Sequence, residues 1–377
     1  MDRIILTTTY TGFNYGTSLQ VLAGKHIVSQ LGYSCDFIRP KSIIKGRDIR
    51  LCKLLAILFR VISLRDYKKL LPFVSSYQKN FIEGTEQLYF KFNEDYIKPL
   101  ELSKSKMKKL AKESVACLAG SDQIWISDAL YVDPIYYLRF APQYKRIAFA
   151  PSFGRDYVAE YNIKKISHWI SEIPYLSVRE DSGVQLIKQL TGRDAVHLLD
   201  PTLVVSRDEW KGILNVCEHK ENYILTYFLD MPSDFAIDKI MQLKKYLGCK
   251  VINIPYQFEK MDFCDDMISA GPKEFIELVL NARFVCTDSF HGTAFALNFH
   301  TPFFTFERLY GNSSKQSFRI LSLLKKFNLL TRYQCDCPIR VLDDINFDLV
   351  DNILLSEKQK TYNYLHNSIV NIKLHGK

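Results

Sequence analysis

Residues that could bind an anion or transfer a proton recur in short clusters, and each cluster directly follows an apolar run. Arg179 carries a planar guanidinium that binds a carboxylate or phosphate through two hydrogen bonds. His291 has an imidazole that donates to a phosphate or transfers a proton near neutral pH. Turns that precede helices, such as those at Gly16 and Gly292, present backbone N–H groups to anions. These residue types indicate a site for an anionic substrate.

Six clusters of this kind follow six predicted strands. Their members are Asn14 and Gly16, then Ser121, Asp122 and Gln123, then Ser152, then Arg179 and Glu180, then Asp200, and finally Ser289, His291 and Gly292. The strands are short apolar runs at 3–8, 115–119, 146–150, 175–178, 195–199 and 284–287. In a parallel α/β sheet, ligands bind beyond the carboxyl ends of the strands. We therefore expect the six clusters to line one cleft.

Helical segments alternate with strands in both halves of the chain. The helices are predicted at 18–31, 158–173, 182–190, 234–247, 273–282 and 293–298, with further strands at 34–38, 223–229, 250–254 and 303–306. This alternation predicts crossover connections and parallel sheets. The predicted fold class is α/β, with two Rossmann-like domains that face a cleft.

The expected domain boundary lies near 205–210. The N-terminal domain spans 1–205 and includes a basic helical insertion at about 41–110. The C-terminal domain spans 206–377, and its last helix, at about 347–366, is expected to pack back on the first domain.

Composition narrows the class of protein. The chain has 377 residues, of which 47% are hydrophobic and 24% charged, as in globular proteins. No apolar run has the length of a membrane-spanning helix, and the N-terminus lacks the features of a signal peptide, so we expect a cytoplasmic protein.

Nine scattered cysteines without a C-x-x-C pair suggest neither a metal nor a redox cofactor. The net charge of +9 favours an anionic partner, and without a recognisable nucleic-acid module we expect no nucleic acid.

A basic segment interrupts the α/β pattern. Residues 41–69 contain nine lysines and arginines against Asp48 and Asp66, and large apolar residues recur between them at helical spacing. The helix either packs on the domain with a solvated basic face or lies on an anionic membrane at the inner face. Peripheral membrane contact would suit a lipid-linked acceptor.

The ordered set of motifs resembles the polysaccharide pyruvyl transferase family. The motifs are Asn14–Gln20, Gly120–Trp125, Ala150–Gly154, Ser177–Glu180, Asp200–Thr202 and Thr287–Gly292, and the resemblance runs to about Phe306. Proteins of this family are similar in fold to the two-domain glycosyltransferases of the B type.

The resemblance implies transfer from phosphoenolpyruvate, as co-substrate, to two hydroxyls of a sugar, which gives a cyclic pyruvate ketal and phosphate. The sugar would belong to a polysaccharide or a lipid-linked oligosaccharide precursor, as in capsule or exopolysaccharide synthesis. We expect Arg179 and His291 to hold the donor, His291 to act as acid, and Asp122 or Glu180 to act as base. Further predicted contacts with substrate are Ser289, Gly292, Asn14, Gly16, Ser121, Gln123 and Ser152.

The sequence departs from the family pattern at one position. Many relatives carry an arginine two residues before the histidine, where this chain has Ser289. Either Arg283, Arg308 or Lys315 supplies the missing cation, or the donor differs from phosphoenolpyruvate. Two other functions therefore stay open: a nucleotide-sugar glycosyltransferase on a similar scaffold, and a non-catalytic relative that binds a phosphorylated ligand.

Overall fold

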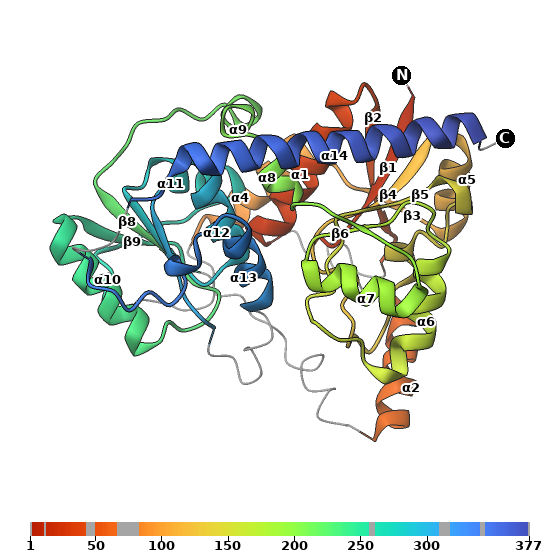
Figure 1. Ribbon diagram of the computed structural model, residues 1–377, viewed down its shortest axis with the longest axis horizontal. Coiled ribbons are helices and arrows are strands. Elements are labelled where there is room, and N and C mark those ends of the chain that lie inside the picture. Colours follow the sequence, from red (N-terminus) through yellow and green to blue (C-terminus); the bar gives the residue numbers. More distant parts are fainter. Residues whose placement is uncertain are drawn as a thin grey trace. The chain divides into compact units, whose positions relative to one another are not determined.

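The computed structural model describes residues 2–10, 13–42, 50–65, 83–255, 261–308, 317–339 and 344–375 (Figure 1). The chain forms two compact units. Unit 1 comprises Met1–Gln78, Tyr96–Pro201 and Lys360–Lys377, and unit 2 comprises Lys79–Asp95 and Thr202–Gln359.

Unit 1 is built on a five-stranded sheet in which every pair of neighbouring strands is parallel. The strand order is β3-β2-β1-β4-β5, with bounds β1 Arg3–Thr7, β2 Ser34–Pro40, β3 Leu100–Leu102, β4 Ala116–Gly120 and β5 Arg146–Phe149. The central strands are buried almost throughout, which explains why they read as continuous apolar runs. The order reverses between β1 and β4, and their carboxyl ends form the switch point where such sheets bind ligands.

Helices and a small second sheet complete unit 1. The second sheet pairs β6 (Ser177–Val178) with β7 (Val196–His197), and a bridge between Ile147 and Tyr175 connects it to β5. The helices are α1 Tyr15–Gln30, α2 Leu51–Leu64, α5 Lys104–Glu113, α6 Glu160–Ser171 and α7 Asp181–Thr191. The aromatic core stacks Trp125 on Tyr137 and packs it against Phe153.

Unit 2 repeats this architecture. Its parallel sheet has the order β10-β9-β8-β11-β12, with bounds β8 Tyr223–Tyr227, β9 Lys250–Asn253, β10 Asp266–Met267, β11 Phe284–Thr287 and β12 Phe303–Thr305. Its switch point lies between β8 and β11. The helices are α4 Thr85–Phe92, α9 Arg207–Leu214, α10 Asp234–Leu247, α11 Pro272–Asn281, α12 Phe290–Asn298 and α13 Ser317–Lys326.

Two helices include residues from both units. The short α8 (Pro201–Val204) lies where the chain leaves unit 1, and Figure 1 shows α14 (Phe347–His375) as one long helix. Lys358 of α14 bonds Glu209 of unit 2 at 2.5 Å, whereas the Tyr364 hydroxyl donates to the Ala148 carbonyl of unit 1 at 2.8 Å. Among the described residues, no helix is both long enough and apolar enough to cross a membrane.

The structure confirms the predicted α/β class with two parallel sheets. It corrects the start of one helix that matters for the site. The helix predicted at 293–298 begins at Phe290, because Ser289 caps it: the Ser289 hydroxyl accepts from the Gly292 N–H at 3.3 Å. His291 therefore lies inside the first turn of α12 and not in the loop before it.

Candidate functional site

A buried arginine cluster lies at the carboxyl ends of the strands of unit 1. The Arg179 guanidinium, whose side chain is 2% exposed, contacts Asp200 Oδ2 at 2.5 Å. Glu180 Oε1 and Asp122 Oδ1 lie 3.6 and 3.7 Å from its other nitrogens. Burial by itself lowers the pKa of Arg179, but the three carboxylates, above all Asp200, more than offset this effect and raise the pKa above its ordinary value. The arginine is a fixed cation within a group of net negative charge.

Hydrogen bonds extend this cluster across the sheet. Asp200 Oδ2 also accepts from the Ser121 hydroxyl at 2.9 Å, and the Ser152 hydroxyl donates to Glu180. The Ser121 carbonyl accepts from the Thr8 hydroxyl at 2.8 Å, which in turn accepts from the Gln20 amide at 2.8 Å. The residues that end β1, β4, β5, β6 and β7 thus form one network. The structure brings together the predicted residues Ser121, Asp122, Ser152, Arg179, Glu180 and Asp200.

The backbone around the cluster adopts an unusual conformation. Asp122 and Ala150 have φ values of 63° and 51°, in the left-handed region that non-glycine residues rarely occupy. The Asp122 carbonyl accepts from the N–H groups of Ile124 and Ser152, at 2.7 and 2.9 Å, which ties the two loops together. Such backbone strain persists where the surroundings fix it, and it is common at functional sites.

Asn14 and Gly16 have structural positions at the start of α1. The Asn14 side chain caps the helix by accepting from the Thr17 N–H at 3.0 Å, and Gly16 is buried in the first turn. The role of Asn14 and Gly16 in substrate binding stays a prediction.

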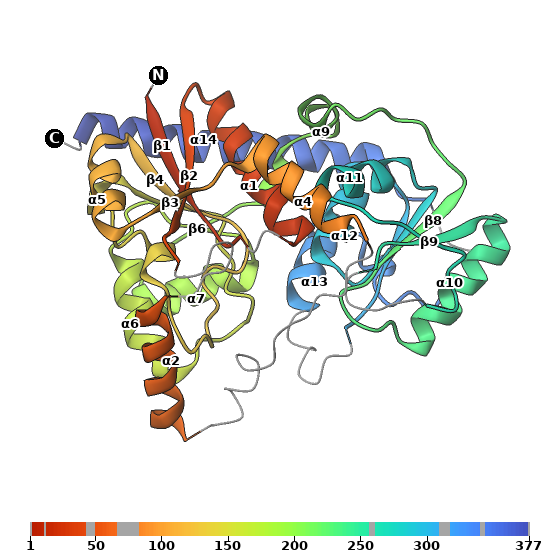
Figure 2. The same cartoon turned by 180° about the vertical axis from the view of Figure 1, so that it is seen from behind.

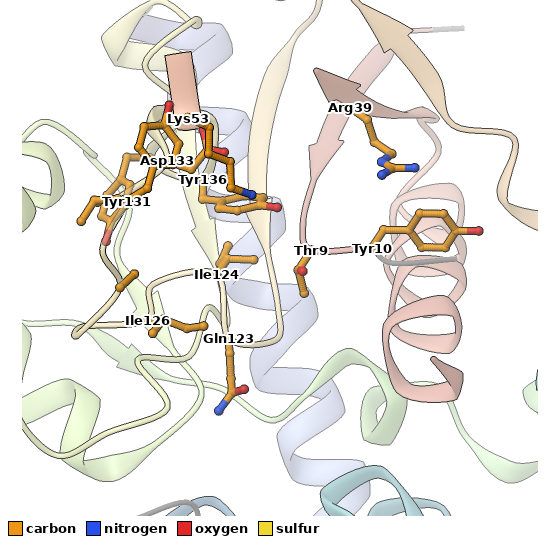
Figure 3. A pocket seen from close by; sticks show the side chains of 13 residues that line it. Thr9, Tyr10, Arg39, Lys53, Gln123, Ile124, Ile126, Tyr131, Asp133 and Tyr136 are labelled. Atoms are coloured by element: carbon orange, nitrogen blue, oxygen red, sulfur yellow. The ribbon is translucent and has the colours of Figure 1, made fainter. Parts of the chain in front are cut away.

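A pocket of about 410 Å³ opens beside the cluster, and we name it the tyrosine pocket (Figure 3). Its polar lining residues are Thr9, Tyr10, Arg39, Lys53, Gln123, Tyr131, Asp133, Tyr136 and Tyr137. Figure 3 shows Arg39 and Tyr10 on one side and Lys53, Tyr131 and Tyr136 on the other. Gln123 was predicted from the sequence, and it follows Asp122 directly, so the tyrosine pocket adjoins the arginine cluster.

In unit 2, Asp288 occupies the switch point between β8 and β11. It is 1% exposed, and its carboxylate accepts from the N–H groups of Leu229 and Asp230 at 2.7 and 3.1 Å. Arg308 Nε lies 3.5 Å from Asp288 Oδ2. Burial raises the pKa of Asp288 to about 6, although Arg308 and the two N–H groups act in the opposite direction.

The first turn of α12 lies next to Asp288. His291 is 8% exposed, and its ring meets that of Phe290 edge-on at 5.2 Å. Gly292 packs so closely on β11 that a Cβ there would lie 2.6 Å from the Thr287 hydroxyl oxygen. The glycine is required by this close approach, which brings the N-terminus of α12 to the carboxyl end of β11.

The structure shows which candidate cation lies near Ser289, the residue that stands where many relatives carry an arginine. Arg283 precedes β11 and bonds Asn222 and the Leu247 carbonyl, at the amino end of the sheet. Arg308 follows β12 at the carboxyl end, and its Nε donates to the Asp288 carbonyl at 3.3 Å. Lys315 lies outside the described residues. Of the two described arginines, only Arg308 is placed beside the Asp288–Gly292 motif.

Some of these residues were not found by sequence reasoning. Asp288 lies in the Thr287–Gly292 motif, but no role was predicted for it, although an acid directly after a buried strand indicates a ligand edge. Lys53 belongs to the basic segment 41–69 but was not predicted to line a pocket, and Arg39, Tyr131 and Tyr136 gave no signal, because they come from β2 and the segment after β4.

Comparison with known proteins decides the family. The family model of polysaccharide pyruvyl transferase matches residues 14–309. The chain belongs to the polysaccharide pyruvyl transferase family. The matched region includes every residue of the arginine cluster and the whole Asp288–Gly292 motif. Among curated proteins, none matches this transferase family member in sequence.

Several solved structures are similar to this family member in fold. A UDP-GlcNAc 2-epimerase from Neisseria meningitidis bound to UDP-GlcNAc has 10% identity and a TM-score of 0.44, covering 96% of this chain and 100% of that one. A ugt transferase from Siraitia grosvenorii in complex with UDP has 10% identity and a TM-score of 0.46, covering 98% and 100%. E. coli heptosyltransferase WaaC has 12% identity and a TM-score of 0.35, covering 82% and 91%.

Proposed function

We propose that this protein transfers a pyruvyl group from phosphoenolpyruvate to two hydroxyls of a sugar in a polysaccharide or glycolipid precursor. The family match over residues 14–309 carries the proposal. In the overall reaction, two C–O bonds to the sugar form at the central carbon of the donor, and its bond to phosphate breaks. One hydroxyl proton ends on the vinyl carbon, which becomes a methyl group, and the other leaves with the phosphate.

The donor anion is assigned to unit 2. His291 and Arg308 supply positive or hydrogen-donating groups, and the first turn of α12 adds the partial positive charge of a helix N-terminus. Arg308 thus takes the place of the arginine that the family pattern has at the position of Ser289. His291 holds the phosphate and delivers the proton to the vinyl carbon, a transfer that typically contributes about a hundred- to ten-thousand-fold in rate.

The base that accepts the sugar proton is assigned to unit 1. Asp122 and Glu180 were both predicted for this role, and two observations favour Asp122. Its neighbour Gln123 lines the tyrosine pocket, and its backbone is held in the left-handed conformation. Glu180 already accepts from the Ser152 hydroxyl, which suits a carboxylate that orients the loop after β5.

Arg179 as a donor contact stays a prediction, and the geometry supports a different role. Three carboxylates already lie against its guanidinium, so its charge is compensated within the protein. We assign it to positioning Asp122 and Glu180, which lie 3.7 and 3.6 Å from its guanidinium nitrogens.

Phosphate release tests this function. Wild-type protein is incubated with phosphoenolpyruvate and a panel of glycans, and phosphate is measured by ³¹P NMR. His291→Ala should lower the rate at least a hundredfold, whereas His219→Ala, a surface histidine of unit 2 paired with Glu221, should leave it unchanged. Wild-type turnover in His291→Ala would remove His291 from the mechanism. Turnover with nucleotide sugars alone would replace the proposal by glycosyl transfer.

A further inference from the structure

The tyrosine pocket has the chemistry of a site for a phosphorylated sugar. Tyr10, Tyr131 and Tyr136 offer aromatic faces for the apolar face of a sugar ring and hydroxyls for its polar groups. Its volume of about 410 Å³ lies in the range of small-molecule sites, roughly 300–1,000 Å³.

The charges of the pocket favour an anion. Arg39 and Lys53 line it from β2 and α2, and the Arg39 guanidinium lies 5.2 Å from the centre of the Tyr10 ring. The pocket has one carboxylate, Asp133, but that group is already paired with Arg50 and accepts from the Ile135 N–H at 3.2 Å. Arg39 also lies 4.0 Å from Glu101 Oε1, a long ion pair at the edge of the sheet. The lining thus has two cations against one carboxylate that is paired with Arg50, and this suits a phosphate attached to the sugar.

The helix that supplies Lys53 also exposes an apolar face. Ile57 and Val61 of α2 are buried against unit 1, and Arg60 holds α2 to α6 by donating to the Tyr161 carbonyl at 3.2 Å (Figures 1 and 2). The other face carries six large apolar residues between 45% and 76% exposed, Leu51, Leu54, Leu55, Leu58, Phe59 and Ile62. Six such residues on one fourteen-residue helix form a patch of a kind that marks an interaction surface.

The charged residues of α2 indicate what its exposed apolar face binds. The helix contains Lys53 and Arg60 but no acidic residue, and the exposed Arg65 ends it. An amphipathic helix with large apolar residues and only basic charges matches the interface of an anionic lipid bilayer. A second pocket, of about 650 Å³ and mostly apolar, adjoins the start of α2. It shares Tyr131 and Asp133 with the tyrosine pocket. Apolar and anion-binding surfaces thus meet at the same helix.

We propose that α2 docks on an anionic membrane and that the tyrosine pocket binds the phosphate-bearing sugar of a lipid-linked acceptor there. The inference rests on the proposed function and names its acceptor class. Lys53 and Arg39 bind the phosphate, the tyrosines hold the sugar, and the lipid chain runs along the apolar side of α2 into the bilayer.

Vesicle sedimentation tests the docking. Wild-type protein should sediment with phosphatidylglycerol vesicles and remain in solution with phosphatidylcholine vesicles. The double variant L55E/F59E should reduce the bound fraction at least tenfold, whereas Tyr246→Glu, an equally exposed apolar residue on α10 of unit 2, should not. Binding that is equal for both lipids, or unchanged in the double variant, would overturn the proposal. So would a dimer in light scattering that L55E/F59E dissociates, because the face would then join two copies of the chain.

Calorimetry with octyl glucosyl phosphate, below its micelle concentration, tests the pocket. Wild-type protein should bind it at least tenfold more tightly than octyl glucoside, and Lys53→Gln and Arg39→Gln should each reduce this preference about tenfold. Equal binding of the two probes would overturn the assignment. Titration of the wild-type protein with phosphoenolpyruvate separates the two proposals. If the protein binds phosphoenolpyruvate but neither vesicles nor octyl glucosyl phosphate, only the acceptor site is contradicted. If it does not bind phosphoenolpyruvate, the proposed function itself is contradicted.

Discussion

Units 1 and 2 both gather charged side chains beyond the carboxyl ends of their strands, but the buried group at the centre differs. In unit 1 a buried arginine is surrounded by three carboxylates, and in unit 2 a buried aspartate is surrounded by backbone N–H groups and Arg308. Asp122 follows β4 and Asp288 follows β11, so each cluster has a carboxylate at its switch point, whereas Arg179 follows β6 of the small second sheet. A shared architecture therefore fixes where the polar groups gather, while the local residues decide whether the position repels or attracts an anion.

The two clusters suit different kinds of ligand. The cluster of unit 1 has an excess of carboxylates, which suits a proton acceptor for a sugar hydroxyl. The cluster of unit 2 combines a helix N-terminus with Arg308 and His291, which suits an anionic donor. The predictions below alter one cluster at a time and compare each change with a matched position.

The largest effect is expected from Arg179→Met. Removing the guanidinium leaves three buried carboxylates without their cation, and breaking a buried ion pair in this way costs about 3–5 kcal/mol. We expect calorimetry to show a fall of roughly 10 °C in the melting temperature of the protein. Arg3→Met, which removes an exposed ion pair with Asp36, should cost less than about 1 kcal/mol. Equal effects of the two substitutions would show that the cluster is not electrostatically coupled.

The pH dependence of Asp288 gives the next largest effect. Because burial raises the pKa of Asp288 to about 6, the folded state disfavours its ionised form. Protonated Asp288 therefore contributes to the free energy of unfolding. This contribution is complete below pH 3.8 and is lost as the pH rises through 6, by on the order of 2–3 kcal/mol. Relative to Asp288→Asn, the melting temperature of the wild type should therefore decline between pH 4 and pH 7. Parallel curves for the two proteins would contradict the raised pKa.

Gly292→Ala tests the close approach of α12 to β11. The new Cβ would lie 2.6 Å from the Thr287 hydroxyl oxygen, and such overpacking costs about 1–3 kcal/mol. Gly212→Ala, in α9 of the same unit, meets no atom within 4 Å and should stabilise by about 0.5–1 kcal/mol. Opposite shifts in melting temperature are expected. A shift of the same sign in both variants would contradict the packing.

The smallest effect is expected from Ser289→Ala. This change removes the cap of α12 and should destabilise the protein by about 1 kcal/mol. Affinity for phosphoenolpyruvate should fall with it, because fraying of the first turn moves His291. Ser233→Ala removes the equivalent cap of α10 and should change stability alone. An unaltered donor affinity in Ser289→Ala would separate the cap from the donor site.

Sequence patterns predicted four of the five strands in each five-stranded sheet and missed the short edge strands β3 and β10. The predicted bounds of α10 and β11 agree with the structure, because Ser233 caps α10 and β11 is buried along its length. The start of α12 was missed, since Gly292 resembles a turn residue although it lies inside the helix to allow close packing. The placement of the clusters after strands also predicted which polar residues of unit 1 meet.

Long-range packing explains what the sequence did not reveal. The tyrosine pocket is assembled from segments distant along the chain, so no local pattern marks it. The pairing of Arg179 with three carboxylates likewise depends on β6 and β7 lying beside β5. By contrast, the position of Arg283 at the amino end of β11 was predictable, because a residue that precedes a strand lies opposite the ligand edge.

Calorimetric titration with phosphoenolpyruvate tests the central claim most directly. Wild type and His219→Ala should bind the donor saturably, and His291→Ala and Arg308→Gln should lose binding at least tenfold. That result would place the donor at the first turn of α12. No binding to wild type at millimolar concentration, or full binding to both site variants, would contradict the assignment of this site to the pyruvyl donor.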